Sequence, residues 1–231
     1  MHPFHWERVA LCGLLLALLV GCGALPTRLD NRGNGADTSQ NRAMHTDLIR
    51  DMLAQHQYYA ALAHIEELKS SSGDTRELRF LEAETRRHLG QTAQSAALYQ
   101  GLIDTEYEAR AYHGLGLLNA GHNLPLAIRQ LRFAVQRQPT DVQFRNDLGY
   151  AEMMAGQYQD ALAELSTATE LDQHSQLSRN NLVMLLYLMH DDVGARRVAS
   201  DSGIGGEELA GLRQRAQALT QSRPGRAGGV K

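Results

Sequence analysis

The chain has 231 residues and a formal net charge of −3; 43% of its residues are hydrophobic and 21% are charged. This composition suits one packed domain or one short array of repeats. It argues against a protein that binds nucleic acid through a strongly basic face, because no run of like charges occurs in the sequence. We therefore expect no nucleic-acid partner.

The N-terminus has the pattern of an export signal. A weakly basic start at 1–8 precedes an apolar run at 9–20. Such a run suits the core of a signal peptide and is shorter than the roughly 20 residues that a membrane-spanning helix needs. We predict that residues 1–21 are a signal peptide.

A candidate lipid-attachment site follows directly. The segment Leu19-Val20-Gly21-Cys22 resembles the lipobox of bacterial lipoproteins. The resemblance implies cleavage before Cys22 and a covalent lipid on its thiol, so Cys22 is the predicted lipidation site. The other cysteine, Cys12, lies in the signal, so the mature chain is expected to form no internal disulfide. The alternative is an ordinary secreted protein with one unmodified cysteine.

The next segment bears on the destination of the protein. Gly23 stands where lipoproteins retained in the inner membrane often carry Asp, so the resemblance implies an outer-membrane location facing the periplasm. Residues 22–42 contain Pro26, Gly33, Gly35 and few large apolar groups. Such a segment buries too little apolar surface to order itself, and we predict a flexible tether at 22–42.

Helical hairpins are predicted over 43–201. The clearest one, at 145–165, reads as a helix, a turn at Gly156 and a second helix. Small residues at Gly149 and Ala161 would let the two helices approach closely. A small residue recurs at Ala61, Ser95, Ala127, Ala161 and Ala195. The spacing between these positions is constant except from Ser95 to Ala127, where it is slightly shorter.

This spacing resembles the tetratricopeptide (TPR) repeat, whose period is about 34 residues. The resemblance implies an all-α TPR solenoid of about five helical hairpins, because each hairpin buries its apolar face only against its neighbours. The fifth hairpin departs from the pattern at its turn, where His190-Asp-Asp192 replaces the usual glycine. We expect a C-terminal capping helix at 202–221 and a disordered tail at 222–231.

The sequence shows no catalytic or metal-binding motif. No H-E-x-x-H pattern, G-x-S-x-G elbow or phosphate loop occurs, and the pair Gly114 and Gly116 lies on a predicted helix, where it favours close packing. We therefore predict that the protein is not an enzyme. We expect no metal, no small-molecule substrate and no cofactor apart from the covalent lipid on Cys22.

A partner-binding groove is predicted from the TPR resemblance, which implies that the first helix of every hairpin lines a concave face. Asn146 and Asn180 would form a ladder along it that bonds a partner's backbone. Alternatives remain: Asn180 bridges neighbouring helices, the methionines and Tyr187 belong to the core, and His113 is an ordinary satisfied histidine. The predicted groove residues are Arg110, His113, Leu117, Asn146, Tyr150, Met153, Asn180, Met184 and Tyr187.

A lipid anchor, a tether and a TPR array together resemble the outer-membrane lipoproteins of pilus machines, in particular the TadD family of the tight-adherence (Flp pilus) system. The segments that carry this resemblance are Pro139-Thr-Asp141, Arg145-Asn-Asp-Leu-Gly-Tyr-Ala151 and Ala111-Tyr-His-Gly-Leu-Gly116. The resemblance implies a pilotin-like factor that binds a secretin subunit or another pilus-assembly protein. Two alternatives remain open: a lipid-anchored TPR adaptor for periplasmic peptidoglycan enzymes or proteases, and a pilotin for type IVa pili.

Overall fold

The structure is a computed structural model that describes residues 33–222. The predicted signal peptide, the lipidation site Cys22, the first part of the tether and the tail at 223–231 lie outside the described residues. Among the helices of the described part, none combines the length and the apolar character needed to cross a membrane.

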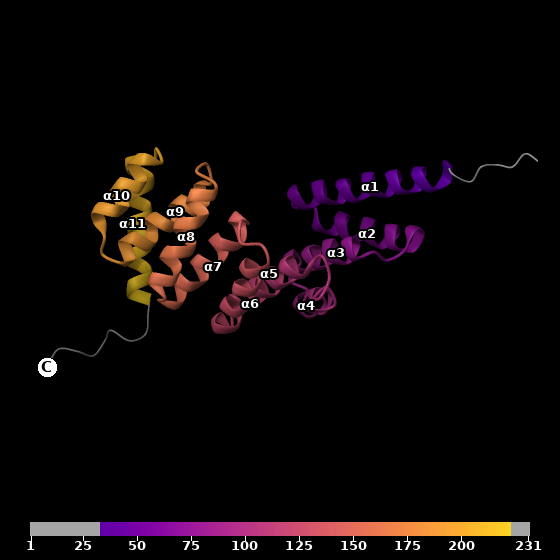
Figure 1. Cartoon of the computed structure of the whole chain (residues 1–231), viewed down its shortest axis with the longest axis horizontal. Coiled ribbons are helices and arrows are strands. Elements are labelled where there is room, and N and C mark those ends of the chain that lie inside the picture. Colours follow the sequence, from indigo (N-terminus) through magenta and orange to yellow (C-terminus); the bar gives the residue numbers. More distant parts are fainter. Residues whose placement is uncertain (1–32, 223–231) are drawn as a thin grey trace, which may run out of the picture.

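The described chain is all-helical and consists of five antiparallel hairpins followed by a single helix (Figure 1). This architecture confirms the predicted solenoid with its capping helix. The helices are α1 Gly33–Ala54, α2 Tyr58–Ser72, α3 Arg76–His88, α4 Thr92–Gln100, α5 Glu108–Asn119, α6 Leu124–Arg137, α7 Val142–Ala155, α8 Tyr158–Leu171, α9 Gln176–Leu188, α10 Asp192–Asp201 and α11 Gly206–Ser222.

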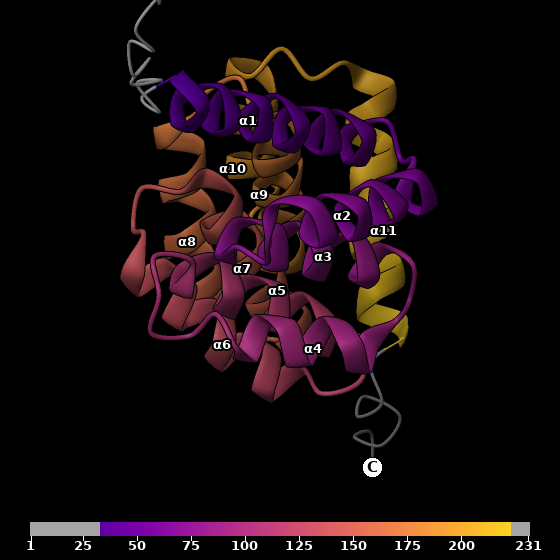
Figure 2. The same cartoon turned by 90° about the vertical axis from the view of Figure 1, so that its right-hand side faces the viewer.

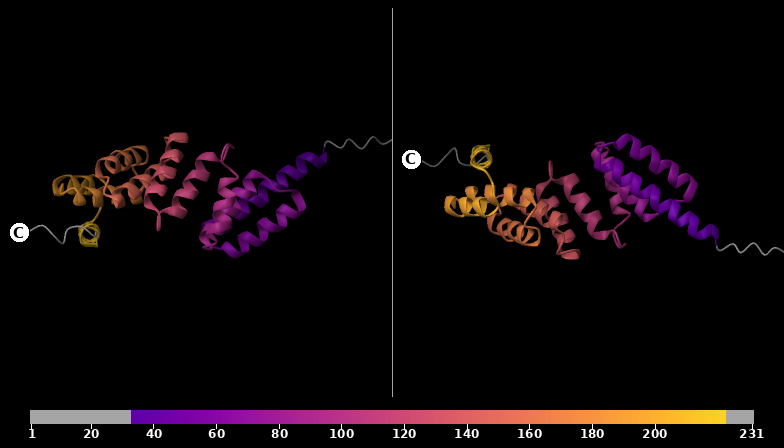
Figure 3. Two further views of the ribbon diagram at one scale, coloured as in Figure 1. Left: turned by 90° about the horizontal axis from the view of Figure 1, so that it is seen from below. Right: turned by 90° about the horizontal axis from the view of Figure 1, so that it is seen from above.

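The hairpins stack in chain order along the long axis of the molecule, with α1 at one end and α10 and α11 at the other (Figures 1 and 2). From α1 to α10 each helix packs against its neighbours in the chain, and α9 also contacts both α7 and α11. Views from above and below show α11 end-on at the C-terminal end of the stack (Figure 3). The solenoid therefore builds its core from contacts between successive repeats.

Small residues set the distance between the helices of a hairpin. A Cβ atom added to Gly149 would lie 2.7 Å from Cγ of Leu165, and one added to Gly116 would lie 2.6 Å from Cγ of Leu131. A Cβ atom on Gly114 would overlap the ring of Tyr99 on α4, so this glycine lets hairpins two and three approach each other. These glycines serve close packing, as the sequence indicated.

In four of the five hairpins the turn uses a left-handed residue at one repeated position. Gly90 and Gly156 have φ angles of 72° and 81° there, while His56 and His190 have φ angles of 60° and 62°. The fifth hairpin therefore keeps the turn although a histidine replaces the glycine. A non-glycine residue in this region is strained by contact between its Cβ atom and the backbone.

Two boundaries differ from the sequence prediction. Helix α1 begins at Gly33, so the predicted end of the tether at 42 lies inside a helix. Once Ile49 is buried and the helix is nucleated, each further residue extends it by one hydrogen bond at little cost. Helix α11 ends at Ser222, which was assigned to the tail.

Candidate protein-binding surface

All nine predicted groove residues lie on the first helices of hairpins three to five, but they do not share one environment. Arg110 and Tyr150 are exposed, and Leu117, Asn180 and Tyr187 are half-buried. The remaining four are buried: His113, Asn146, Met153 and Met184. The predicted groove thus divides into an open part and a part that belongs to the interior.

The two buried polar residues belong to a hydrogen-bond network that crosses three first helices. His113 Nε2 on α5 lies 2.7 Å from Asp147 Oδ2 on α7, and because a carboxylate only accepts, this nitrogen carries the proton. Asn146 Nδ2 donates to the other oxygen of Asp147 at 3.0 Å. Asn181 Nδ2 on α9 donates to Asn146 Oδ1 at 2.9 Å. The network joins hairpins three, four and five.

This network corrects the predicted asparagine ladder. Asn146 bonds to Asn181, one residue beyond the expected position, because adjacent first helices approach closely enough for their side chains to meet. Asn180 instead donates to Glu208 Oε1 on α11 at 2.8 Å, so it bridges neighbouring helices. That bond and a second one from Gln176 hold the pKa of the Glu208 carboxyl below its ordinary value. In the structure Asn146 is buried and Asn180 is half-buried, and both side-chain amides bond to other helices of the array.

The two methionines are also wrong as groove residues. Met153 and Met184 have 0% and 6% of their surface exposed and lie in the apolar cluster that joins α7, α8, α9, α10 and α11. Tyr187 packs on the edge of the same cluster, and the guanidinium of Arg213 on α11 lies 5.7 Å from its ring. The capping helix therefore covers this end of the predicted groove.

Three of the predicted residues remain on open surface, and a fourth joins them. Arg110, Leu117 and Tyr150 keep exposed surface on α5 and α7, and Leu177 in the first turn of α9 is 60% exposed. The prediction missed Leu177 because, among the first turns of α5, α7 and α9, it used only Arg110 on α5. Counting one repeat forward from Gln143 would have found it. We call Arg110, Leu117, Tyr150 and Leu177 the inner groove, a name that marks them as first-helix residues with exposed surface.

The inner groove ends in a cation supported by aromatic rings. The guanidinium of Arg110 lies 5.7 Å from the ring of Phe80 and 5.9 Å from that of Tyr107, and these two rings stack at 5.4 Å. Arg110 forms no ion pair with a carboxylate in the described part of the chain. Its guanidinium is therefore held in place by the two aromatic rings, and no carboxylate of residues 33–222 neutralises its charge.

A buried carboxylate lies behind the groove on the other face of α7. Both Nε and Nη2 of Arg132 donate to Glu152 Oε1, at 3.0 and 2.7 Å, while the buried Oε2 accepts no hydrogen bond. Burial raises the pKa of the Glu152 carboxyl despite the opposing effect of Arg132. This pair faces the second helices and is separate from the inner groove. Within residues 33–222, no three side chains are grouped so that they could hold a metal ion.

The fold and its open first-helix surface define a helical-repeat protein of the kind that binds polypeptide segments. No family model matches the chain. It is 35% identical over 206 residues to the TPR repeat-containing protein PA4299 of Pseudomonas aeruginosa, covering 89% of this chain and 82% of that one. The chain therefore belongs to the TPR repeat-containing proteins.

Solved structures agree with this assignment at the level of the fold. The structure of pilF from Pseudomonas aeruginosa has a TM-score of 0.65 at 15% identity, covering 81% of this chain and 87% of that one. A thermophilic TPR protein of Thermus thermophilus has a TM-score of 0.57 at 19% identity, covering 78% of this chain and 99% of that one. The predicted TPR solenoid is thereby confirmed.

Proposed function

We propose that the protein is a lipid-anchored TPR protein of the outer membrane that captures a partner protein in the inner groove, as a pilotin-like factor for a secretin in Flp pilus biogenesis. One observation carries the proposal. Tyr150 is 41% exposed and Leu177 is 60% exposed on α7 and α9, the first helices of successive hairpins. Exposed apolar side chains on such a scaffold form an interaction surface for a polypeptide segment.

The groove defines the chemistry of the segment that fits it. Leu117, Tyr150 and Leu177 offer apolar contact, and the tyrosine adds a hydroxyl that can bond to a peptide backbone. Arg110, whose charge no carboxylate of the described chain neutralises, favours an acidic group at one end of the segment. The proposed ligand is therefore an apolar polypeptide segment with an acidic residue near one end.

The anchor gives the groove its proposed role. A lipid on Cys22 would hold the array near the periplasmic surface of the outer membrane, where a captured subunit is kept at high effective concentration. The support for this step is the lipobox-like segment that ends at Cys22 and the resemblance of the repeats to TadD-type lipoproteins. Delivery of the secretin would require both parts of the protein.

A pull-down from detergent extract tests the proposal. We expect the full chain to recover a secretin subunit, and we expect Tyr150→Ala combined with Leu177→Ala to lose it. Tyr59→Ala is the matched control, because Tyr59 is 78% exposed but lies on the second helix α2. Recovery of peptidoglycan hydrolases or proteases without a secretin would favour the alternative of a lipid-anchored TPR adaptor. Recovery of a type IVa secretin would favour the alternative of a pilotin for type IVa pili.

A further inference from the structure

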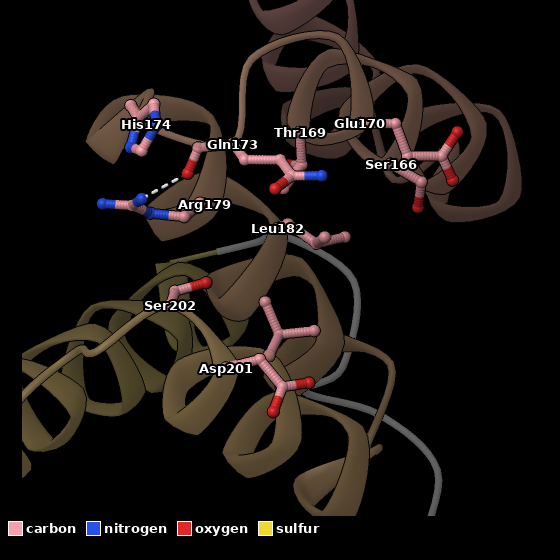
Figure 4. Close-up of a pocket in the computed structure, with 10 residues that line it drawn as sticks. Ser166, Thr169, Glu170, Gln173, His174, Arg179, Leu182, Asp201 and Ser202 are labelled. Carbon is pink, nitrogen blue, oxygen red and sulfur yellow. Dashed lines mark hydrogen bonds between the residues drawn. The ribbon is translucent and has the colours of Figure 1, made fainter.

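A second open site lies between the last two hairpins. A cleft of about 650 Å³ is bounded by the C-terminal half of α8, the start of α9 and the end of α10 (Figure 4). Leu182 and Val198 supply its apolar part, and Arg179 lies on one side. None of its lining residues belongs to the inner groove.

The equivalent place in hairpin four is closed by an internal ion pair. Arg145 stands one repeat before Arg179, at the same position of its hairpin. Its Nε donates to the carbonyl oxygen of Pro139, and its Nη1 lies 2.6 Å from Glu164 Oε2 on α8. Both charged side chains are largely buried, with 17% and 21% of their surface exposed. Hairpin four thus satisfies its own arginine.

Hairpin five keeps the arginine and loses the carboxylate. Gln173 replaces Pro139 and accepts a hydrogen bond from Arg179 Nη1, but Val198 replaces Glu164. Arg179 Nε is buried and has no hydrogen-bond partner, and Arg179 forms no ion pair in the described part of the chain. A buried donor without an acceptor is unfavourable and rare in folded proteins. The repeat therefore leaves a cation where its neighbour holds a neutral pair.

Two carboxylates also line the cleft. Figure 4 shows Arg179 beside His174 at the left, Glu170 at the upper right on α8 and Asp201 at the bottom on α10. Neither carboxylate lies within ion-pair distance of Arg179 in the structure. The cleft therefore presents opposite charges across an apolar floor, which a segment with both kinds of charge would match.

We infer that this cleft is a second protein-binding site, which takes a polypeptide segment carrying an acidic side chain for Arg179 and a basic side chain for Glu170 and Asp201. The geometry of Arg145 shows how the arginine would respond. If Nε of Arg179 took over the bond to the carbonyl of Gln173, Nη1 would be released toward the cleft. The ligand carboxylate would then occupy the place that Glu164 has in hairpin four.

The repeat itself supplies the decisive variant. Val198→Glu places a carboxylate at the position of Glu164, so it should satisfy Arg179 from within and exclude the ligand carboxylate. Arg179→Gln should remove the attraction by a different route. Tyr150→Ala alters only the inner groove and should leave this cleft unchanged, which separates failure of this site from failure of the groove.

The probe is a phage library of short random peptides, selected on the full chain in detergent and counter-selected on Val198→Glu. We expect the selected peptides to share an acidic residue close to a basic one. The best synthetic peptide should lose about tenfold or more in affinity for Val198→Glu and for Arg179→Gln, and retain its affinity for Tyr150→Ala. Circular dichroism and thermal melting of both cleft variants check that they are folded.

Two results would overturn the site. One is a library that yields no peptides separating the wild-type chain from Val198→Glu. The other is a selected peptide that binds equally well after its acidic residue is replaced by the corresponding amide.

Discussion

Hairpins four and five follow the same frame one repeat apart, yet they solve the same packing problem with different residues. In hairpin four the pair is Gly149 and Leu165, whereas in hairpin five it is Val183 and Ala199. Leu165 and Val183 are fully buried, and Ala199 is 1% exposed. The larger residue has moved from the second helix to the first, so the repeat keeps the combined volume and not the identity of the two residues.

The same comparison explains where surface becomes available. Apolar and small positions keep the fold in both hairpins, while charged positions differ: Arg145 has Glu164, and Arg179 has Val198. In hairpin four the buried residue Glu152 lies on the face of α7 turned away from the inner groove. In hairpin five the equivalent residue is Leu186. Polar differences between repeats that share one backbone thus give the two proposed binding sites their different chemistry.

The largest predicted effect comes from exchanging the packing pair. Gly149→Val should destabilise the protein by about 3 kcal/mol, because its Cβ atom would clash with Leu165. Leu165→Ala alone should cost about 3 kcal/mol by leaving a cavity. The double variant reproduces the pair of hairpin five, and we expect a favourable coupling of about 2 kcal/mol. Urea unfolding of the wild type, the two single variants and the double variant measures this coupling. Strict additivity of the two single effects would show that the two side chains do not share one space.

The second prediction concerns the polar network. Asn146→Ala leaves Asn181 and Asp147 without a bond that each now makes, so we expect a loss of about 2 kcal/mol in the free energy of unfolding. Asn180→Ala breaks one bond, to Glu208 near the surface, and should cost about 1 kcal/mol or less. Equal losses in urea titrations would contradict the assignment of Asn146 to the buried network.

The third prediction concerns pH. Burial raises the pKa of Glu152 in the folded protein above the ordinary value of 4.5, so ionisation favours the unfolded chain as pH rises through the interval between the two values. Glu152→Leu copies Leu186 and removes this dependence. The variant should therefore gain stability relative to the wild type as pH rises from 4.5 to neutral, because it has no carboxyl group there to ionise. Parallel pH profiles for the two proteins would show that Glu152 is not perturbed.

The smallest effect is expected at the turns. His190→Gly should stabilise the protein by about 0.5–1 kcal/mol, because glycine adopts a φ angle of 62° without steric strain. Gly156→Ala should destabilise the equivalent turn by about 1 kcal/mol, since its φ angle is 81°. Thermal melting of both variants checks the signs. A lower melting temperature for His190→Gly would mean that the histidine contributes contacts that outweigh its backbone strain.

The sequence predicted the architecture because helix spacing depends on local rules. The recurring small residue, Ala161 in hairpin four, together with Gly149 fixes how closely the two helices of that hairpin approach, and this can be derived from the sequence alone. The environment of Asn146 cannot be derived in this way. It depends on the distance between α7 and α9, which allows Asn181 to reach it.

The candidate site was predicted in part for the same reason. Helical spacing placed all nine residues on first helices, but it did not show that α11 returns to α9 and covers Tyr187 and Asn180. Helix α11 lies far along the chain from the groove, and the sequence does not specify its docking angle. Leu177 was missed although the repeat step reaches it, because it stands in the first turn of α9.

Site-specific photocrosslinking tests the central proposal most directly. A photoreactive phenylalanine analogue is placed at position 150 or at position 59 of the full chain, in cells that also produce the pilus machinery. The account predicts one crosslinked partner at position 150, identified by mass spectrometry as a secretin subunit, and no crosslink to it at position 59. Absence of any partner at position 150, or the same partner at both positions, would contradict capture by the inner groove.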